Sequence, residues 1–255
     1  MRLCVLASGS KGNCIWVEEE RRAVLLDNGL SYKEFSQRAK AVGLNQAFLK
    51  DVAVSHEHSD HVKGIGPLAR KLKLTVHMTE GAAEAADQVI GEAQVKTFQA
   101  GDEISLGPLR LKTVTGSHDC RDPVVFVVSG AKKSVGVVTD LGAATNLVRG
   151  AIKDVDALVL ESNHDLTMLL NGPYPLFLKQ RVRSRQGHLS NEQAGDLLKE
   201  VCHSGLGLVV LAHLSEVNNT PELAKTAALK ALKEVGHRPT LAVASQNMPT
   251  KIFEF

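Results

Sequence analysis

The chain has 255 residues, of which 44% are apolar and 23% are charged. A chain of this length and composition buries a sizeable core, and we expect one domain that covers residues 1–255. The formal net charge of +2 at pH 7 is too small to identify a nucleic-acid binder on its own. No stretch reaches the ~18 apolar residues of a transmembrane helix, so we expect no membrane association.

The first residues and the cysteines favour a cytoplasmic location. The apolar run that begins at Leu3 meets Ser8 and Lys11 before it reaches the length of a signal-peptide core. The four cysteines form no CxxC pair and are too few for a disulfide framework in a chain of this length. We therefore expect reduced thiols.

Short β-type runs open the chain. They cover Arg2 to Ala7, Cys14 to Glu18 and Ala23 to Asp27, and turns rich in Gly, Ser and charge separate them. This pattern predicts an antiparallel start. Val52 to Ser55 predicts another buried strand, and Val62 to Lys73 has apolar residues at helical spacing. The segment between these two elements lies at a strand-to-helix junction.

The rest of the chain alternates between predicted helices and strands. The predicted strands are Ile104 to Ser105, Leu109 to Val114, Val124 to Val128, Ser134 to Thr139, Ala157 to Glu161 and Leu208 to Ala212, followed by a final pair near the C-terminus. The predicted helices are Thr79 to Val89, one that begins near Ser190, and Thr220 to Val235. Strands come first and helices last in each half, which predicts two sheets packed face to face with helices on both outer faces.

Four potential metal ligands occur within six residues, directly after the predicted strand that ends at Ser55: His56, His58, Asp60 and His61. His56 and His58 are two residues apart, so in extended backbone their side chains project to one side. Asp60 and His61 can approach the same volume from the turn that follows. A lone histidine is usually solvated, whereas a cluster of this kind indicates a metal site.

Three later apolar runs also end in a residue that can bind metal: His118, Asp140 and His213. Together with the cluster they supply five histidines and two aspartates, which is enough for two metal ions. A carboxylate such as Asp140 can bridge two cations ~3.5 to 4 Å apart. The imidazole-rich set predicts two zinc ions per chain, and its oxygen ligands leave manganese as the alternative.

The cluster followed in order by His118, Asp140 and His213 resembles the signature of the metallo-β-lactamase superfamily. Further segments resemble its WalJ/YycJ-like branch, which is related to ribonuclease Z and ribonuclease J. These segments are Leu6 to Asn13, Ser55 to Gly64, Leu160 to Asp165, Asn171 to Pro175, Gly187 to Asn191 and Ala212 to Asn219. The resemblance implies a four-layer αββα sandwich, with two mixed sheets flanked by helices and the metals at one edge between the sheets.

The same resemblance implies a division of the ligands. One metal ion would be held by His56, His58 and His118, and the other by Asp60, His61 and His213. Asp140 would lie between the two ions.

His188 and Asp60 are the predicted catalytic residues. Asp60 would orient the attacking hydroxide as well as bind metal. Related tRNA-processing nucleases have a His-Ser/Thr segment next to the scissile phosphate, which implies that His188 stabilises the phosphorane-like charge or protonates the leaving oxygen. The alternative is a loop histidine beside a helix N-terminus, with Ser190 or Asn191 as the N-cap.

A basic run leads into His188. Lys179, Arg181, Arg183 and Arg185 alternate, so on an extended stretch they would share one face and contact a phosphate backbone. The alternative is a solvated surface. We also expect substrate contacts from Ser190, from Asn13 in a tight turn beside the site, and from His164, which either reaches the rim or hydrogen-bonds a loop. Three other histidines are expected to be structural or solvated: His77, His203 and His237.

The sequence is compatible with three functions. The first is a phosphodiester hydrolase of nucleic acid, in which a hydroxide activated by two metal ions attacks phosphorus. The resemblance makes DNA the expected partner and implies an exonuclease that works from the 5′ end. The second is a small-molecule hydrolase that opens a thioester, lactone or cyclic phosphodiester, for which the basic run is not needed. The third is a non-catalytic regulatory module, but no ligand is missing from the signature.

Overall fold

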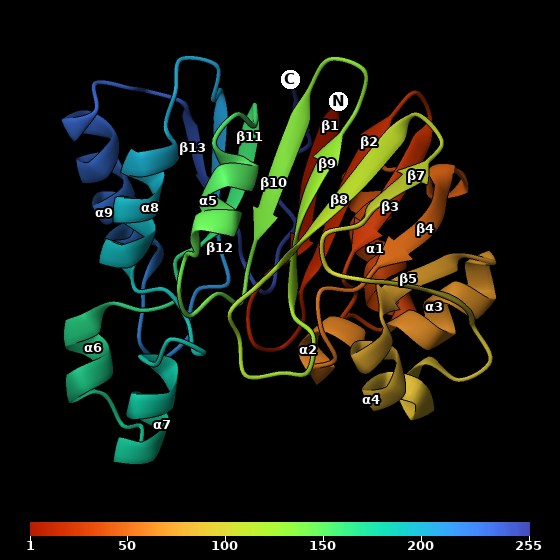
Figure 1. Ribbon diagram of the computed structural model, residues 1–255, viewed down its shortest axis with the longest axis horizontal. Coiled ribbons are helices and arrows are strands. Elements are labelled where there is room, and N and C mark those ends of the chain that lie inside the picture. The colour runs from red at the N-terminus through yellow and green to blue at the C-terminus, as the bar shows by residue number, and fades with distance from the viewer.

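The computed structural model describes residues 1–255, and its strands form two seven-stranded sheets. The sheets pack face to face, and helices cover both outer faces (Figure 1). This arrangement confirms the predicted αββα sandwich of two mixed sheets. No helix combines the length and the apolar character that spanning a bilayer requires.

The first sheet has the strand order β14-β1-β2-β3-β4-β5-β6. Its strands are β1 (Arg2–Ala7), β2 (Cys14–Glu19), β3 (Arg22–Leu26), β4 (Leu49–Ala53), β5 (Thr75–Thr79), β6 (Gln94–Phe98) and β14 (Phe253–Glu254). β1, β2 and β3 pair antiparallel, as predicted. From β3 to β6 every pairing is parallel, so the ends of β3, β4 and β5 lie at one edge.

The second sheet has the order β13-β12-β11-β10-β9-β8-β7. Its strands are β7 (Glu103–Leu106), β8 (Leu109–Thr115), β9 (Val124–Ser129), β10 (Ser134–Val138), β11 (Ala157–Glu161), β12 (Leu208–Ala212) and β13 (Thr240–Val243). β10 to β13 are parallel. The last two strands of the chain do not pair with each other, because β13 joins the second sheet and β14 the first.

The helices divide between the two faces (Figure 1). On the side of the first sheet lie α1 (Tyr32–Ala41), the 3-10 helix η1 (Gln46–Phe48), α2 (Ser59–Val62), α3 (Ile65–Leu72) and α4 (Glu80–Ile90). On the side of the second sheet lie α5 (Asn146–Ile152), α8 (Asn191–Val201) and α9 (Pro221–Glu234). Two short helices, α6 (Leu166–Asn171) and α7 (Leu176–Val182), project below the second sheet in the view of Figure 1.

The prediction of one helix from Val62 to Lys73 was wrong in one respect. The chain forms α2 and α3 instead, with Gly64 between them. A Cβ on Gly64 would lie 1.7 Å from the carbonyl oxygen of Leu30, so only glycine allows this approach. The break lets α2 turn back toward the end of β3.

Three buried clusters stabilise the four layers. One lies between the sheets and contains Val5, Ile15 and Val137. The other two lie between each sheet and its helices, with Trp16 and Phe35 in one and valines and leucines of β10 to β12 in the other. The central strands β11 and β12 are therefore buried on both faces, which explains their continuous apolar sequence.

Candidate metal centre

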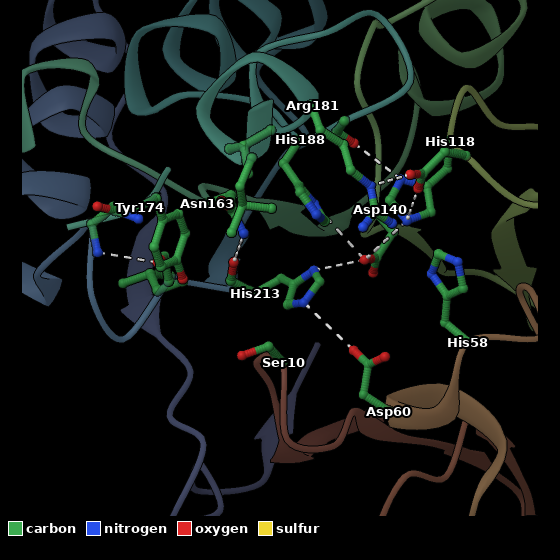
Figure 2. A pocket seen from close by; sticks show the side chains of 17 residues that line it. Ser10, His58, Asp60, His118, Asp140, Asn163, Tyr174, Arg181, His188 and His213 are labelled. Carbon is green, nitrogen blue, oxygen red and sulfur yellow. Dashed lines mark hydrogen bonds and ion pairs between the residues drawn. The ribbon is translucent and has the colours of Figure 1, made fainter. Parts of the chain in front are cut away.

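Segments that follow four strands converge on one cavity at an edge of the sandwich (Figure 2). The histidine-rich segment follows β4, while His118, Asp140 and His213 follow β8, β10 and β12. The cavity has a volume of about 200 Å³. The structure thus brings together seven residues that lie up to 157 positions apart, from His56 to His213.

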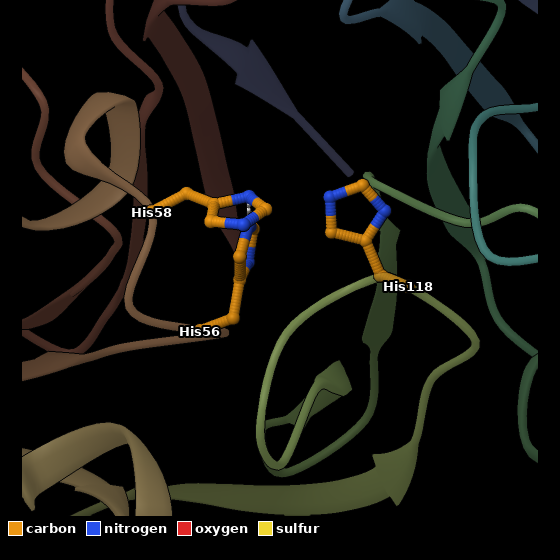
Figure 3. A group of neighbouring side chains, drawn as sticks. All are labelled: His56, His58 and His118. Atoms are coloured by element: carbon orange, nitrogen blue, oxygen red, sulfur yellow. Dashed lines mark hydrogen bonds between the residues drawn. The ribbon is translucent and has the colours of Figure 1, made fainter. Parts of the chain in front are cut away.

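His56, His58 and His118 form one group of potential ligands, with donor nitrogens within 4.8 Å of one another. Nε2 of His56 lies 3.1 Å from Nδ1 of His58. The ring of His118 lies 5.0 Å from each of the other two, and Figure 3 shows the three rings facing one another. Burial and the neighbouring His61 lower the pKa of His56, which favours the neutral form that binds metal.

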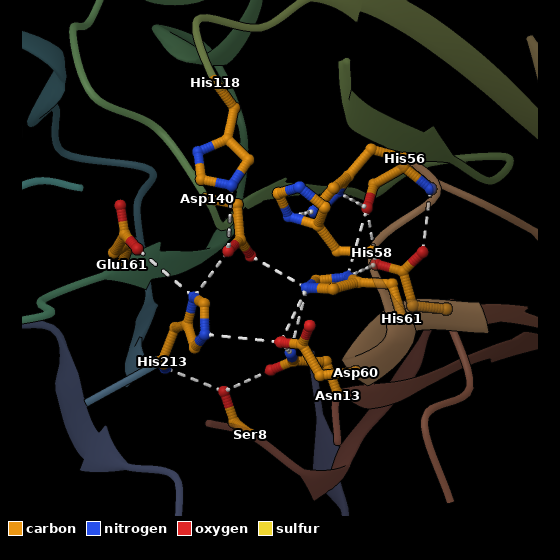
Figure 4. A network of polar contacts seen from close by, with 12 residues as sticks. Ser8, Asn13, His56, His58, Asp60, His61, His118, Asp140, Glu161 and His213 are labelled. Atoms are coloured by element: carbon orange, nitrogen blue, oxygen red, sulfur yellow. Dashed lines mark hydrogen bonds and ion pairs between the residues drawn. The ribbon is translucent and has the colours of Figure 1, made fainter. Parts of the chain in front are cut away.

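Asp60, His61, Asp140 and His213 form a second group with the same spacing limit of 4.8 Å. Asp140 contacts both groups (Figure 4). Its Oδ2 lies 3.1 Å from Nε2 of His61, and its Oδ1 lies 3.0 Å from Nδ1 of His213 and 3.8 Å from Nε2 of His118. A single carboxylate therefore stands between the two groups.

The donor set fits divalent cations. Oδ2 of Asp140 and Nδ1 of His213 are buried, and their close contacts with His61 and Asp140 do not have hydrogen-bond geometry. Burial alone would lower the pKa of His213, but Asp140 and Glu161 raise it to about 10. The two carboxylates thus favour positive charge at this position, which a bound divalent cation would supply.

Two of the histidines are oriented by Asp27, which the sequence analysis did not single out. Nδ1 of His61 donates to Oδ2 of Asp27 at 2.8 Å. Ser55 donates its hydroxyl to the same oxygen at 2.8 Å and lies 2.9 Å from Nδ1 of His56. In the other half of the site, Nδ1 of His118 donates to the carbonyl of Gly187 at 3.0 Å. Such partners fix the tautomer and direct the second ring nitrogen toward the metal.

Three residues of the site have left-handed backbone conformations. The φ angles are 62° at Asp27, 55° at Asp140 and 53° at His213. Each of these residues comes directly after a strand or one residue later. Non-glycine residues with positive φ are uncommon and cluster at functional sites, where the surrounding structure maintains them. The turn at each strand end therefore aims the side chain into the centre.

His188 lines the cavity and pairs with Glu161, the buried last residue of β11. Nδ1 of His188 lies 2.7 Å from Oε1 of Glu161. The other carboxylate oxygen accepts from the backbone N–H of Leu141 at 2.9 Å and of Leu189 at 3.0 Å. Burial would raise the pKa of Glu161, but His188 and the hydrogen bonds lower it to about 2. Glu161 is thus a charged residue that accepts a hydrogen bond from Nδ1 of His188 and so orients its ring.

Glu161 and His188 also form a third group of potential ligands with Asp140 and His213. Glu161 was not predicted from the sequence. The available signal was a carboxylate at the end of the apolar run Ala157 to Leu160, the same pattern that identified Asp140.

The basic run does not form the predicted extended stretch. Lys179 and Arg181 lie on α7, because Pro175 is well suited to precede a helix and the following residues continue it. Arg181 lines the cavity and forms an ion pair with Asp119. Arg183 and Arg185 face a different hollow, which α5 and α8 border. The prediction of one shared face was therefore wrong.

The structure separates the remaining candidates. Nδ2 of Asn13 donates to Oδ2 of Asp60 at 3.1 Å and lies 3.0 Å from Nε2 of His61, so Asn13 contacts ligands. Ser190 caps α8 by accepting from the N–H of Gln193 at 3.2 Å. His164 is 1% exposed. Neither Ser190 nor His164 lines the cavity.

Three histidines are structural, as expected. Nε2 of His77 lies 3.0 Å from Oδ1 of Asp51. His203 and His237 each bond to a backbone carbonyl, that of Val155 and that of Leu206. None of the three lines the cavity.

Comparisons with known proteins agree with this geometry. The model of the "Beta-lactamase superfamily domain" matches residues 22–214. The chain is 36% identical to "Exodeoxyribonuclease YycJ" of Bacillus anthracis, over 99% of this chain and 98% of that protein. It is 31% identical to "Exodeoxyribonuclease WalJ" of Streptococcus pneumoniae, over 90% of this chain and 87% of that protein.

Solved structures share the fold at low sequence identity. The metallo-β-lactamase fold protein YhfI from Bacillus subtilis has a TM-score of 0.74 at 18% identity, with 99% of each chain covered. Zn²⁺-bound PqqB from Methylobacterium extorquens has a TM-score of 0.72 at 14% identity, with 98% of this chain and 99% of that chain covered. The chain therefore belongs to the beta-lactamase superfamily and, within it, to the family of YycJ and WalJ.

Proposed function

We propose that this protein is a metal-dependent exonuclease that degrades DNA from the 5′ end. The observation that carries the proposal is the position of Asp140 between two groups of histidines, beside a cavity that also contains His188 and Arg181. The names of the YycJ and WalJ relatives support DNA as the substrate.

Two divalent ions per chain are part of the proposal, with zinc favoured by the imidazole-rich donors and manganese as the alternative. One ion would be held by His56, His58 and His118, the other by Asp60, His61 and His213, with Asp140 shared. When bound, such ions stabilise the charge on the phosphodiester and lower the pKa of water to about 7.

Asp60 is suited to orient the attacking water. Its Oδ2 is held by the amide of Asn13 at 3.1 Å, while its Oδ1 makes no hydrogen bond and the residue lines the cavity. Oδ1 of Asp60 can therefore accept a hydrogen bond from a water molecule in the cavity, while Oδ2 keeps its hydrogen bond from Asn13.

His188 is suited to donate a proton to the departing oxygen. Glu161 accepts from Nδ1, which leaves Nε2 without a protein partner in a residue that lines the cavity. In the reaction, water releases one proton to solvent and forms a new bond to phosphorus, and the bond from phosphorus to the departing oxygen breaks. The proton from Nε2 makes that oxygen a neutral hydroxyl. Arg181 would meanwhile contact a phosphate oxygen and orient the strand.

The alternative is a small-molecule hydrolase with the same metal centre. A neutral thioester or lactone does not need a guanidinium at the cavity, so Arg181 favours a phosphodiester. A direct comparison of substrates separates the two functions.

The experiment uses metal-free protein loaded with zinc or manganese. Single-stranded and duplex DNA and RNA, labelled at either end, are incubated with the wild type and with Asp60→Ala. We expect a 5′ label to leave as a mononucleotide at once, and a 3′ label to give a descending ladder. If no strand is cut while a thioester or lactone is hydrolysed, the nuclease proposal fails. Fewer than one metal ion per chain by elemental analysis would contradict the metal centre itself.

A further inference from the structure

The cavity beside the metal centre has two chemically different kinds of lining residue. One kind consists of the histidines and aspartates described above. The cavity is also lined by four hydrophobic residues, Tyr174, Leu178, Val182 and Leu214. Figure 2 shows Tyr174 on the side of the cavity away from His58 and His118. A ligand that fills this space therefore needs a charged end and an apolar end.

Helix α7 supplies two of these four hydrophobic residues. Leu178, Arg181 and Val182 line the cavity at positions i, i+3 and i+4, which is one face of the helix. Tyr174 lies just before the helix, in the turn that joins α6 to α7. Its side chain is half-buried, and its hydroxyl forms no hydrogen bond within the protein. The ring is thus placed at the cavity without being tied to another residue.

Asn218 adds a polar group to the same part of the cavity. The residue is 1% exposed, and its Oδ1 is buried without a hydrogen-bond partner. This oxygen faces the α6–α7 turn, since a Cβ on Gly172 would lie 2.5 Å from it. A buried acceptor without a partner is costly, and native structures rarely contain one without a reason. Asn218 thus stands between the cavity and the α6–α7 turn.

A nucleotide matches both kinds of residue. Its phosphate is suited to the metal centre and to Arg181, and its base has flat faces with N–H groups at its edge. We propose that Tyr174, Leu178, Val182 and Asn218 form a base subsite, in which the terminal base of a single-stranded end stacks on Tyr174. This inference rests on the proposed exonuclease function and specifies its substrate class.

Stacking in this cavity requires an unpaired base. Enzymes that enclose a base take it out of the duplex, and that step is easiest when the strand is already single. Aromatic rings bind the bases of single strands without strict sequence preference, because every base has a π-face. The terminal base must therefore be unpaired when it enters the cavity, whether at a single-stranded end or at the frayed end of a duplex.

Phe177 provides a matched control. It lies on α7 three residues after Tyr174, but it is 70% exposed and does not line the cavity. Phe177→Ala removes an aromatic ring from α7 without changing a residue of the proposed subsite. Tyr174→Phe keeps the ring and removes only the hydroxyl.

The first test measures by fluorescence whether the terminal base stacks on Tyr174. A single strand with 2-aminopurine at its 5′ end and phosphorothioate linkages that resist cutting is bound to metal-loaded protein at saturation. We expect its fluorescence to be quenched by the wild type, Tyr174→Phe and Phe177→Ala, and to remain high with Tyr174→Ala. Equal quenching by Tyr174→Ala would overturn the subsite.

The second test is a kinetic cycle. A 5′-terminal abasic residue should lower kcat/KM of the wild type about tenfold, within the range of base–aromatic stacking. Tyr174→Ala should lower kcat/KM on the normal strand by about the same factor. When Tyr174→Ala acts on the strand with the abasic residue, the loss of kcat/KM should stay near tenfold, because the two changes remove the same contact. Losses that multiply to about a hundredfold would mean independent effects and contradict the inference.

Failure of the inference is distinguishable from failure of the nuclease function. A wild type that cuts DNA but ignores the abasic residue at either end overturns only the base subsite. If only an abasic residue at the 3′ end lowers kcat/KM, the subsite is supported and the proposed polarity is reversed. A wild type that cuts no strand with either metal overturns the function, and it overturns the inference that depends on it.

Discussion

Oδ2 of Asp27 accepts a hydrogen bond from Nδ1 of His61 at 2.8 Å, and both side chains are buried. The same carboxylate accepts from the backbone N–H of Ser55 at 2.7 Å and from its hydroxyl at 2.8 Å. Asp27 thus connects two histidines of the metal centre, one of them through Ser55. Because Asp27 contacts Nδ1, the other ring nitrogen of His61 points toward Asp60 and Asp140.

Asp27→Asn should weaken metal binding without altering the fold. An amide accepts on only one side, so one of the donors loses its partner, while asparagine tolerates the positive φ at this position. We expect affinity for metal to fall about 10- to 100-fold, as for other outer partners of metal-binding histidines. Competition with a chelator of known affinity measures this change. Unchanged affinity would show that Asp27 has no part in orienting His61.

Asp140→Asn should weaken the binding of both metal ions. Asp140 contacts both groups of ligands, and its φ of 55° suits asparagine. Elemental analysis should find fewer ions per chain, and hydrolysis should fall by more than the ~100-fold cost of losing an outer partner. Zinc at 100 times its dissociation constant should stabilise the wild type by about 2.7 kcal/mol per site. The variant should lack most of this gain in thermal unfolding, and equal stabilisation would exclude Asp140 as a shared ligand.

His188→Ala should lower kcat by about 10² to 10⁴ on DNA and change KM little, because a proton donor acts in the transition state. The decisive comparison uses thymidine 5′-monophosphate p-nitrophenyl ester, whose leaving group needs no proton. We expect the variant to hydrolyse this ester nearly as well as the wild type does. An equal loss on both substrates would instead assign His188 to charge stabilisation or binding.

The ion pair around Asp51 predicts an acid-sensitive contribution to stability, far from the metal centre. Burial would raise the pKa of Asp51, but the hydrogen bond from His77 and the charge of Arg22 bring it below its usual value. A carboxylate with a depressed pKa in the folded state stabilises the protein above its unfolded pKa. This contribution is lost as pH falls through the folded pKa.

Asp51→Asn should therefore lower the free energy of unfolding by about 1–3 kcal/mol at neutral pH. It should also flatten the decline of stability below the ordinary aspartate pKa of about 3.9. Urea unfolding at several pH values tests both effects. Glu34→Gln is the control, since Glu34 also has a lowered pKa, caused by Ser31, but lies exposed on α1. An equally steep acid limb in Asp51→Asn would contradict the assignment.

The residues that meet in the candidate metal centre could mostly be predicted because each follows a recognisable strand. The apolar runs before Asp140 and His213 mark buried strands, and polar residues at their ends had to emerge at a sheet edge. Asp27 and Glu161 follow the same rule, at the ends of β3 and β11. They were missed because a carboxylate after a strand is common, and only the strand order shows which ones meet at the centre.

The run from Lys179 to Arg185 was predicted as extended, but its first part is helical. Alternating charges look alike on a strand and on the exposed side of a helix, so spacing alone did not separate the two. Pro175 at the start of α7 was the better signal. Strand β6 was also missed, because most of its side chains are exposed and its sequence lacks a buried apolar run.

The ligands of the centre come from both sheets, since the histidine-rich segment follows β4 of the first, whereas His118, Asp140 and His213 follow strands of the second. Neither half of the chain contains the complete set. A hydrolytic centre assembled in this way can become active only after the sheets have docked. A chain that is still folding, or whose sheets have separated, therefore lacks the complete centre.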